Sequence, residues 1–203
     1  AADISSDTTI SSANTNTQQN FTANNVTLTI NADTTGRTNN GISVDGGISG
    51  ATVIVGSGVT VSVTNNQAID GTGSTNLTVT NSGILSAVAK TIELEGSASG
   101  AVITNNFGGT ITAQNNTIKT QNNSSNITVN NSGVISTTSI GHAIATATGT
   151  DSGMVINNFS TGQILKTSTA DAAQETIELG DSGTITNSGQ IRNDTSPSNT
   201  SIR

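Results

Sequence analysis

The residues whose types could do chemistry are a few carboxylates and one lysine. Glu93 and Glu95 flank Leu94, so in an extended strand both carboxylates point to the same, outward side. Lys90 precedes them on the same stretch. Clustered carboxylates supply the acid and base of sugar-cleaving enzymes, so these three residues are the candidate group of a polysaccharide lyase or hydrolase. The competing interpretation is a solvated acidic face.

A second group of acids lies near the end of the chain. Glu178 occupies the slot that matches Glu93 in a later repeat, too far away to pair with it, and Glu175 and Asp181 lie nearby. If the protein binds a partner through polar groups, these acids are the candidates together with the first group. The candidate binding residues are therefore Lys90, Glu93, Glu95, Glu175, Glu178 and Asp181.

Other reactive side chains are scarce. The chain has one histidine, His142, and no cysteine, so we expect no disulfide, no metal site and no cofactor. A Ser-His-Asp triad is disfavoured for the same reason, and no Gly-x-Ser-x-Gly elbow lies between a strand and a helix. We expect His142 at a turn or on the surface and Met154 in the core.

The composition excludes several classes of protein. Of 203 residues, 111 are Thr, Ser, Asn or Gly, and the apolar fraction is 31%, below the roughly 45–50% of typical globular domains. Only 9% of residues are charged, which disfavours a helical bundle. A net charge of −7 disfavours binding to nucleic acid or to anionic membranes. No apolar run approaches the ~18 residues of a membrane span.

Two landmarks recur along the chain with the same period. A turn phrase, such as Asn81-Ser82-Gly83-Ile84, places glycines at positions 58, 83, 109, 133, 162 and 189. A second phrase centres on isoleucines at 42, 69, 92, 118, 144 and 177, so both landmarks repeat about every 26 residues. One such repeat is too small to bury its own apolar face, and stacked repeats form a solenoid.

Each repeat is interpreted as strand, Asn-Gly turn, strand, loop, strand. We predict an all-β fold, a single right-handed parallel β-helix with three strands and about 26 residues per coil and six to seven coils. The predicted divisions are an N-terminal cap or irregular segment at 1–25, the β-helix at 26–192 and a frayed tail at 193–203. The longest loop, at 167–175, is a candidate functional loop.

The turns and the strands carry further expectations. Turn asparagines recurring one coil apart can donate amide to amide, so we predict a ladder of Asn81, Asn106, Asn131, Asn158 and Asn187. Phe107 and Phe159 share one slot two repeats apart and are expected to cover that corner. Flat arrays of Thr-x-Thr can order water and bind ice, but the phrases at 78–80 and 110–112 do not recur in register in every coil.

The repeats resemble a known family. Stretches such as Thr91-Ile92-Glu93-Leu94-Glu95-Gly96 and Val79-Thr80-Asn81-Ser82-Gly83-Ile84 look like the passenger regions of Gram-negative autotransporters, over about residues 40–192. Filamentous-haemagglutinin-type exoproteins look similar. The resemblance implies a right-handed parallel β-helix exported to the cell surface, separate here from the family's membrane barrel. It carries little information about function, because passengers include adhesins, toxins and enzymes.

These observations favour a non-enzymatic adhesin or partner-binding protein that is secreted or exposed on the bacterial cell surface. The expected partner is a host-cell surface protein or glycan, or a second copy of the chain, with no nucleic acid and no insertion into a membrane. One alternative is a released effector that binds a host-cell receptor. The other is the polysaccharide-active enzyme built around Glu93, Glu95 and Lys90.

Overall fold

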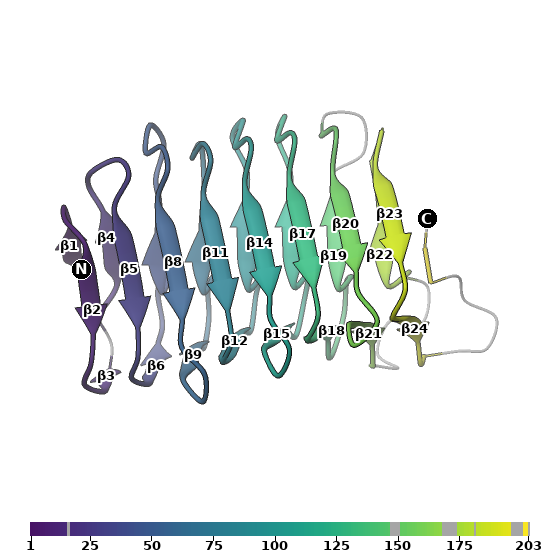
Figure 1. The fold of residues 1–203 in the computed structure, drawn as a ribbon, viewed down its shortest axis with the longest axis horizontal. Coiled ribbons are helices and arrows are strands. Elements are labelled where there is room, and N and C mark those ends of the chain that lie inside the picture. The colour runs from purple at the N-terminus through teal and green to yellow at the C-terminus, as the bar shows by residue number, and fades with distance from the viewer. Residues whose placement is uncertain (16, 147–150, 168–173, 181, 196–200, 203) are drawn as a thin grey trace.

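The chain forms three parallel β-sheets that wind into a solenoid (Figure 1). The computed structural model describes residues 1–15, 17–146, 151–167, 174–180, 182–195 and 201–202, and within these ranges it contains 24 strands and no helix. Each sheet has eight strands and takes every third strand of the chain. Three consecutive strands therefore make one coil, and each coil pairs with the next through all three sheets.

We name the sheets by their first strands. Sheet A contains β1 (Ala2–Ile4), β4 (Gln19–Phe21), β7 (Ile42–Ser43), β10 (Ile69–Asp70), β13 (Ile92–Leu94), β16 (Ile118–Thr120), β19 (Ile144–Thr146) and β22 (Ile177–Glu178). Sheet B contains β2 (Thr8–Ile10), β5 (Thr27–Ile30), β8 (Thr52–Val55), β11 (Thr78–Asn81), β14 (Val102–Asn105), β17 (Thr128–Asn131), β20 (Val155–Asn158) and β23 (Thr184–Asn187). Sheet C contains β3 (Asn14–Thr15), β6 (Thr34–Arg37), β9 (Thr60–Val63), β12 (Ile84–Ala87), β15 (Thr110–Ala113), β18 (Val134–Thr137), β21 (Gln163–Lys166) and β24 (Gln190–Asn193).

The predicted parallel solenoid with three strands and about 26 residues per coil is confirmed, and β5 to β24 form the six to seven coils expected. The segment 1–25 is more regular than expected, because it contains β1 to β4 and β1 pairs in parallel with β4. The tail also pairs in part, since Ile202 forms a parallel bridge with Ile177 of sheet A.

Aliphatic side chains stack in columns inside the coils. The six isoleucines that set the sequence period are direct register partners along sheet A, from Ile42 to Ile177. Val79 and Ile111 belong to equivalent columns in sheets B and C, and all of these side chains are fully buried. β-Branched residues suit this narrow core because they pack well on a pleated surface. Met154 is buried as predicted.

An asparagine ladder runs along the B–C corner, the turns that join sheet B to sheet C. Each side-chain amide N–H donates to the amide oxygen of the asparagine one coil further along. The successive distances are 2.9 Å (Asn81 to Asn105), 2.9 Å (Asn105 to Asn131), 2.8 Å (Asn131 to Asn158) and 2.7 Å (Asn158 to Asn187). The prediction of Asn106 in this ladder was wrong. Asn105 ends β14 in register with Asn81, and the extra residues of this coil lie after it in the turn. Asn106 instead donates to the Ser82 hydroxyl at 2.9 Å.

Candidate functional site

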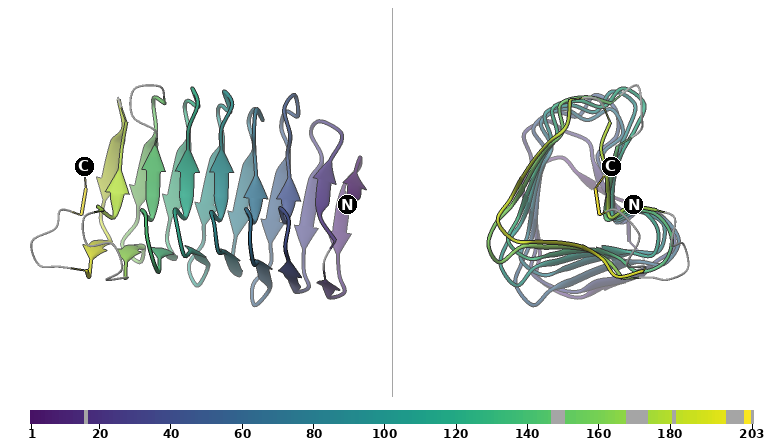
Figure 2. Two further views of the ribbon diagram at one scale, coloured as in Figure 1. Left: turned by 180° about the vertical axis from the view of Figure 1, so that it is seen from behind. Right: turned by 90° about the vertical axis from the view of Figure 1, so that its right-hand side faces the viewer.

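The first candidate site lies on the outward face of sheet A. Ser43, Asp70, Glu93 and Lys119 are successive register partners on that face. Glu93 is only 3% exposed although it points away from the core. The end-on view of Figure 2 shows an indented side next to the two termini, which adjoin sheet A. The side chains of Gln67, Lys90 and Gln121 contact this outward carboxylate and cover it.

Glu93 is held by three donors from three consecutive coils. Lys90 Nζ forms an ion pair with Oε1, and Gln121 Nε2 donates to the same oxygen at 3.0 Å. Gln67 Nε2 donates to Oε2. Lys90 and Glu93, which are three residues apart in the sequence, are therefore in direct contact. Because both carboxylate oxygens accept hydrogen bonds, Glu93 links its own coil to the coils before and after it.

Glu95 and Asp70 extend the same network. Gln121 Nε2 also donates to Glu95, which accepts a second bond from Asn122 Nδ2 at 3.3 Å and lies 3.4 Å from Thr72 Oγ1. Thr72 Oγ1 in turn donates to Asp70 at 2.7 Å. Carboxylates saturated in this way stabilise the stack of coils, since each charged hydrogen bond is worth about 1.5–3 kcal/mol.

The second group of acids gathers around the histidine. Glu175 and Glu178 place Oε2 atoms 3.7 Å and 3.5 Å from His142 Nε2. Asn116 Oδ1, from the preceding coil, accepts from the His142 backbone N–H at 2.9 Å and lies 3.2 Å from Nδ1. Because Asn116 Oδ1 is fixed as an acceptor by the backbone bond, Nδ1 carries the proton in the neutral ring. Asp181 lies outside the described residues.

His142 lies in the connection between β18 and β19, as expected for a turn residue, but it is not at the surface, because only 6% of it is exposed. Burial lowers the pKa of His142, and the nearby Lys119 and Lys166 act in the same direction, while Glu178 and Glu175 oppose them. Nε2 is buried without a hydrogen-bond partner. Sequence reasoning grouped Glu175 with Glu178 but missed His142 and Asn116, because stacking of coils and not spacing in the chain brings these residues to the acids.

Two buried cations share a column of sheet C. Arg37 pairs with Val63 in register, and Lys166 pairs with Thr137 further along the same column. Lys166 is fully buried and donates to the Gly141 carbonyl at 2.7 Å, and Arg37 Nη1 donates to the Gly41 carbonyl. Burial lowers the pKa of Arg37. Both side chains close the corner between sheets C and A by capping backbone carbonyls, and sequence reasoning missed them.

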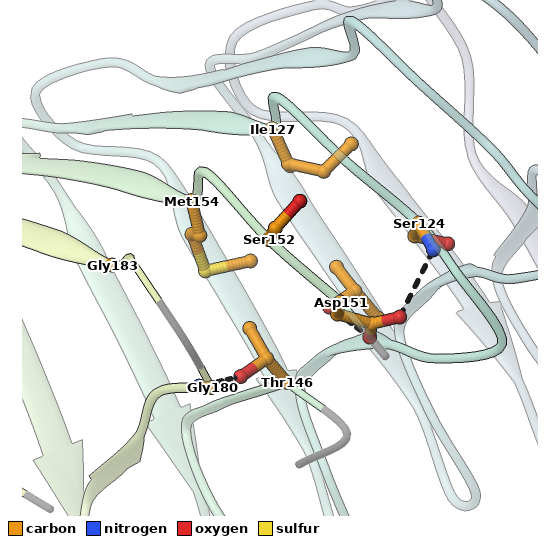
Figure 3. Close-up of a pocket in the computed structure, with 9 residues that line it drawn as sticks. Ser124, Ile127, Thr146, Asp151, Ser152, Met154, Gly180 and Gly183 are labelled. Atoms are coloured by element: carbon orange, nitrogen blue, oxygen red, sulfur yellow. Dashed lines mark hydrogen bonds between the residues drawn. The ribbon is translucent and has the colours of Figure 1, made fainter. Parts of the chain in front are cut away.

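A small cavity lies near the end of the solenoid, lined by Thr120 of β16, Thr146 of β19 and residues of the connections from sheet A to sheet B (Figure 3). Asp151 points toward Ser124 and accepts its backbone N–H at 2.9 Å, and Thr120 Oγ1 donates to the other carboxylate oxygen at 2.9 Å. Met154 lies on the opposite wall. The cavity has about 10 Å³ of free space, the lower limit for one water molecule. It is a packing feature and is too small for an organic ligand.

The B–C corner carries the most exposed apolar side chains. Its turns alternate between four residues (56–59, 106–109, 159–162) and two residues (82–83, 132–133, 188–189) from β8 to β24. Two of the long turns carry Phe107 and Phe159, which are 78% and 49% exposed. The expectation that these rings share one slot and cover the corner was wrong. Phe107 is the second residue of its turn and Phe159 is the first residue of its own, and both rings project from the corner. A shallow hollow beside Phe107 is lined by Ser132, Val134 and Gln163 of the neighbouring coils.

Two features are absent from the part of the chain that the structure describes. None of its His, Asp and Glu residues form a group of three or more able to hold a metal ion. No helix within it is long and apolar enough to cross a membrane.

Comparison with known proteins gave no match. No family model matches the chain, and neither a curated protein nor a solved structure matches it.

Proposed function

We propose that this protein is a secreted or surface-exposed, non-enzymatic binding protein of the adhesin type, similar in plan to an autotransporter passenger. The exposed aromatic pair Phe107 and Phe159 is the single observation that carries the proposal. Large exposed aromatics are costly in water and are enriched among the residues that dominate protein interfaces. The B–C corner is therefore the binding edge.

The geometry of the corner suits a macromolecular partner. Long turns occur on every second coil, so their tips are about 9.6 Å apart for a strand spacing of about 4.8 Å. The short turn at 132–133 lies between the two phenylalanine turns and forms the floor of the hollow. A partner protein that offers apolar side chains at this spacing would contact both rings. We take a host-cell surface protein as the partner, with a glycan or a second copy as other outcomes.

The acidic network supports the non-enzymatic part of the proposal. Both Glu93 oxygens are occupied by side chains of this chain, and Glu95 accepts from Gln121 and Asn122. A general acid must be free to exchange its proton with substrate. The role of Lys90, Glu93 and Glu95 is accordingly to join coils, which also explains why they lie in the indentation and not on a projecting loop.

Binding to cells tests this proposal. The chain has no cysteine, so a single Ser5→Cys change at an exposed position allows one fluorescent label. We expect saturable binding to cultured epithelial cells that the unlabelled chain competes away. The Phe107→Ala/Phe159→Ala variant is expected to bind at least about tenfold more weakly, because removing interface aromatics costs about 2 kcal/mol or more.

Two control variants make the result specific. Ile140→Ala removes an apolar side chain that is 48% exposed on another corner, and it should leave binding unchanged. Glu93→Gln/Glu95→Gln should also leave it unchanged, whereas an enzyme built on these acids would lose polysaccharide cleavage. Absence of saturable binding, or equal binding by the double phenylalanine variant and the parent, would overturn the proposal. Binding to the chain itself in sedimentation would assign the corner to self-association.

A further inference from the structure

Sheet B presents two ranks of small side chains on its outward face. From β5 to β23, nine of the 14 outward positions are threonine. The first rank is Thr27, Thr52, Thr78, Val102, Thr128, Val155 and Thr184. The second rank is Thr29, Ile54, Thr80, Thr104, Asn130, Asn157 and Thr186. None of these residues is charged, although the chain has a net charge of −7.

The register makes these ranks a regular grid. All strands of sheet B from β5 to β23 pair through four consecutive residues without a shift, and they lie across the face turned to the viewer in Figure 1. Neighbouring side chains in a rank are thus about 4.8 Å apart, and the two ranks are about 6.6 Å apart. Fixed spacing in two directions distinguishes this face from an ordinary polar surface.

Four of the five positions that are not threonine keep the surface even, and the fifth, Ile54, is a larger aliphatic side chain. Val102 and Val155 have nearly the shape of threonine, with a methyl in place of the hydroxyl. Asn157 Nδ2 donates to Asn130 Oδ1 at 2.9 Å, which holds both amides in the second rank. The Thr110-Ile111-Thr112 phrase lies on sheet C and not on this face. Comparing it with Thr78-Val79-Thr80 in the sequence mixes two faces and hides the alignment on sheet B.

We propose that the outward face of sheet B binds ice. Hydroxyl groups on a rectangular grid can take the place of water oxygens in an ordered layer, and the prism face of hexagonal ice presents oxygens in arrays of similar dimensions. The methyl groups between them favour removal of mobile water from the face. Charged side chains, which hold their own hydration shells strongly, are excluded from all 14 positions. Crystalline polysaccharide is a poorer fit, because the face has no aromatic ring for sugars to stack on.

The test uses the full chain and one matched pair of variants. Thr104 and Thr110 belong to the same coil, are both half-buried and point outward, but Thr104 lies on sheet B and Thr110 on sheet C. Thr104→Lys places a charged, protruding side chain in the middle of the grid, and Thr110→Lys makes the same change outside it. We expect the parent and Thr110→Lys to inhibit ice recrystallisation and to partition into slowly growing ice, and Thr104→Lys to lose both activities.

Circular dichroism and thermal unfolding of the three proteins establish that the fold is kept. A third variant, Thr104→Val, keeps the shape and removes one hydroxyl, and it should retain most of the activity if the grid acts as a surface. The proposal is overturned if the parent neither inhibits recrystallisation nor enters ice. Equal activity of Thr104→Lys and the parent would overturn it as well. Failure here leaves the binding edge at the phenylalanine turns unaffected, because that edge lies on the corner and not on sheet B.

Discussion

The asparagine ladder allows a stability effect to be worked out from the structure. Asn105 is fully buried, and its Nδ2 donates to Asn131 Oδ1 (2.9 Å), Val134 O (3.1 Å) and Gly109 O (3.2 Å). Its Oδ1 accepts from Asn81 at 2.9 Å. Val55 occupies the equivalent position one coil before Asn81, so the site accepts valine sterically. Asn105→Val therefore tests the hydrogen bonds and not the volume.

The expected cost of Asn105→Val is about 3 kcal/mol in the free energy of unfolding. Asn131 Oδ1 would be left buried without a donor, at about 2 kcal/mol, and loss of the remaining bonds adds about 1 kcal/mol. The remainder is small because Asn81 Nδ2 keeps the Gly83 and Thr110 carbonyls as acceptors, and the Gly109 carbonyl keeps the Val134 N–H. The structure already contains one such defect, since Asn81 Oδ1 is buried and unpartnered next to Val55.

Urea unfolding followed by far-ultraviolet circular dichroism measures this cost. Asn130→Val is the control, because Asn130 lies in the neighbouring strand β17 but points outward and is half-buried, and among the described residues its side chain only accepts one bond, from Asn157. A change of about 0.5 kcal/mol or less is expected there, as for most surface substitutions. If Asn105→Val and Asn130→Val differ by less than about 1 kcal/mol, the ladder is not a main source of stability and the reasoning is refuted.

Three further predictions concern burial and turn geometry. Since burial lowers the pKa of His142, the unfolded chain binds its proton first, so stability should fall as pH drops through about 6.5 and level off below the lowered pKa. His142→Gln should flatten that part of the pH dependence of the urea midpoint. If the curve is unchanged, the loss of stability in this pH range comes from other groups. Gly133→Ala should cost about 3 kcal/mol, because its Cβ would lie 2.2 Å from the Gly109 carbonyl oxygen. Gly108→Ala, with open space around it but a φ of +81°, should cost only about 1 kcal/mol, and thermal melts that reverse this order would contradict the turn geometry. Glu93→Gln should lower stability by about 2 kcal/mol through the loss of charged hydrogen bonds, and an unchanged urea midpoint would show that the network does not join the coils.

The period of the solenoid could be read from the sequence because one residue type marks each coil. Isoleucine recurs at the same inward position of sheet A, from Ile42 to Ile177. A buried column tolerates few other side chains, so isoleucine recurs in every coil from Ile42 to Ile177 and marks the period in the sequence. The choice between Asn105 and Asn106 could not be made in the same way, because adjacent identical residues leave the register of a turn undetermined until the strand pairing is known.

The sites were harder to predict because they depend on contacts between coils. His142 lies far in the chain from Asn116 and from Glu175 and Glu178, and no pattern in the sequence joins them. The exposure of Phe107 depends on the length of its turn, which lifts the ring away from the core. Lys166 reads as a surface residue in the sequence, yet the inward direction of its column places it inside the corner.

The register of the coils is the central claim, because the ladder, the carboxylate network and the threonine grid all depend on it. Paired spin labels measure it directly in this cysteine-free chain. Labels at positions 29 and 157 lie in one rank of sheet B and five coils apart, which predicts about 24 Å between their backbones. Moving the second label from 157 to 186, one coil further, should lengthen the distance by about 5 Å. Two narrow distributions separated by that step are the predicted result, and broad or equal distributions would contradict the solenoid register.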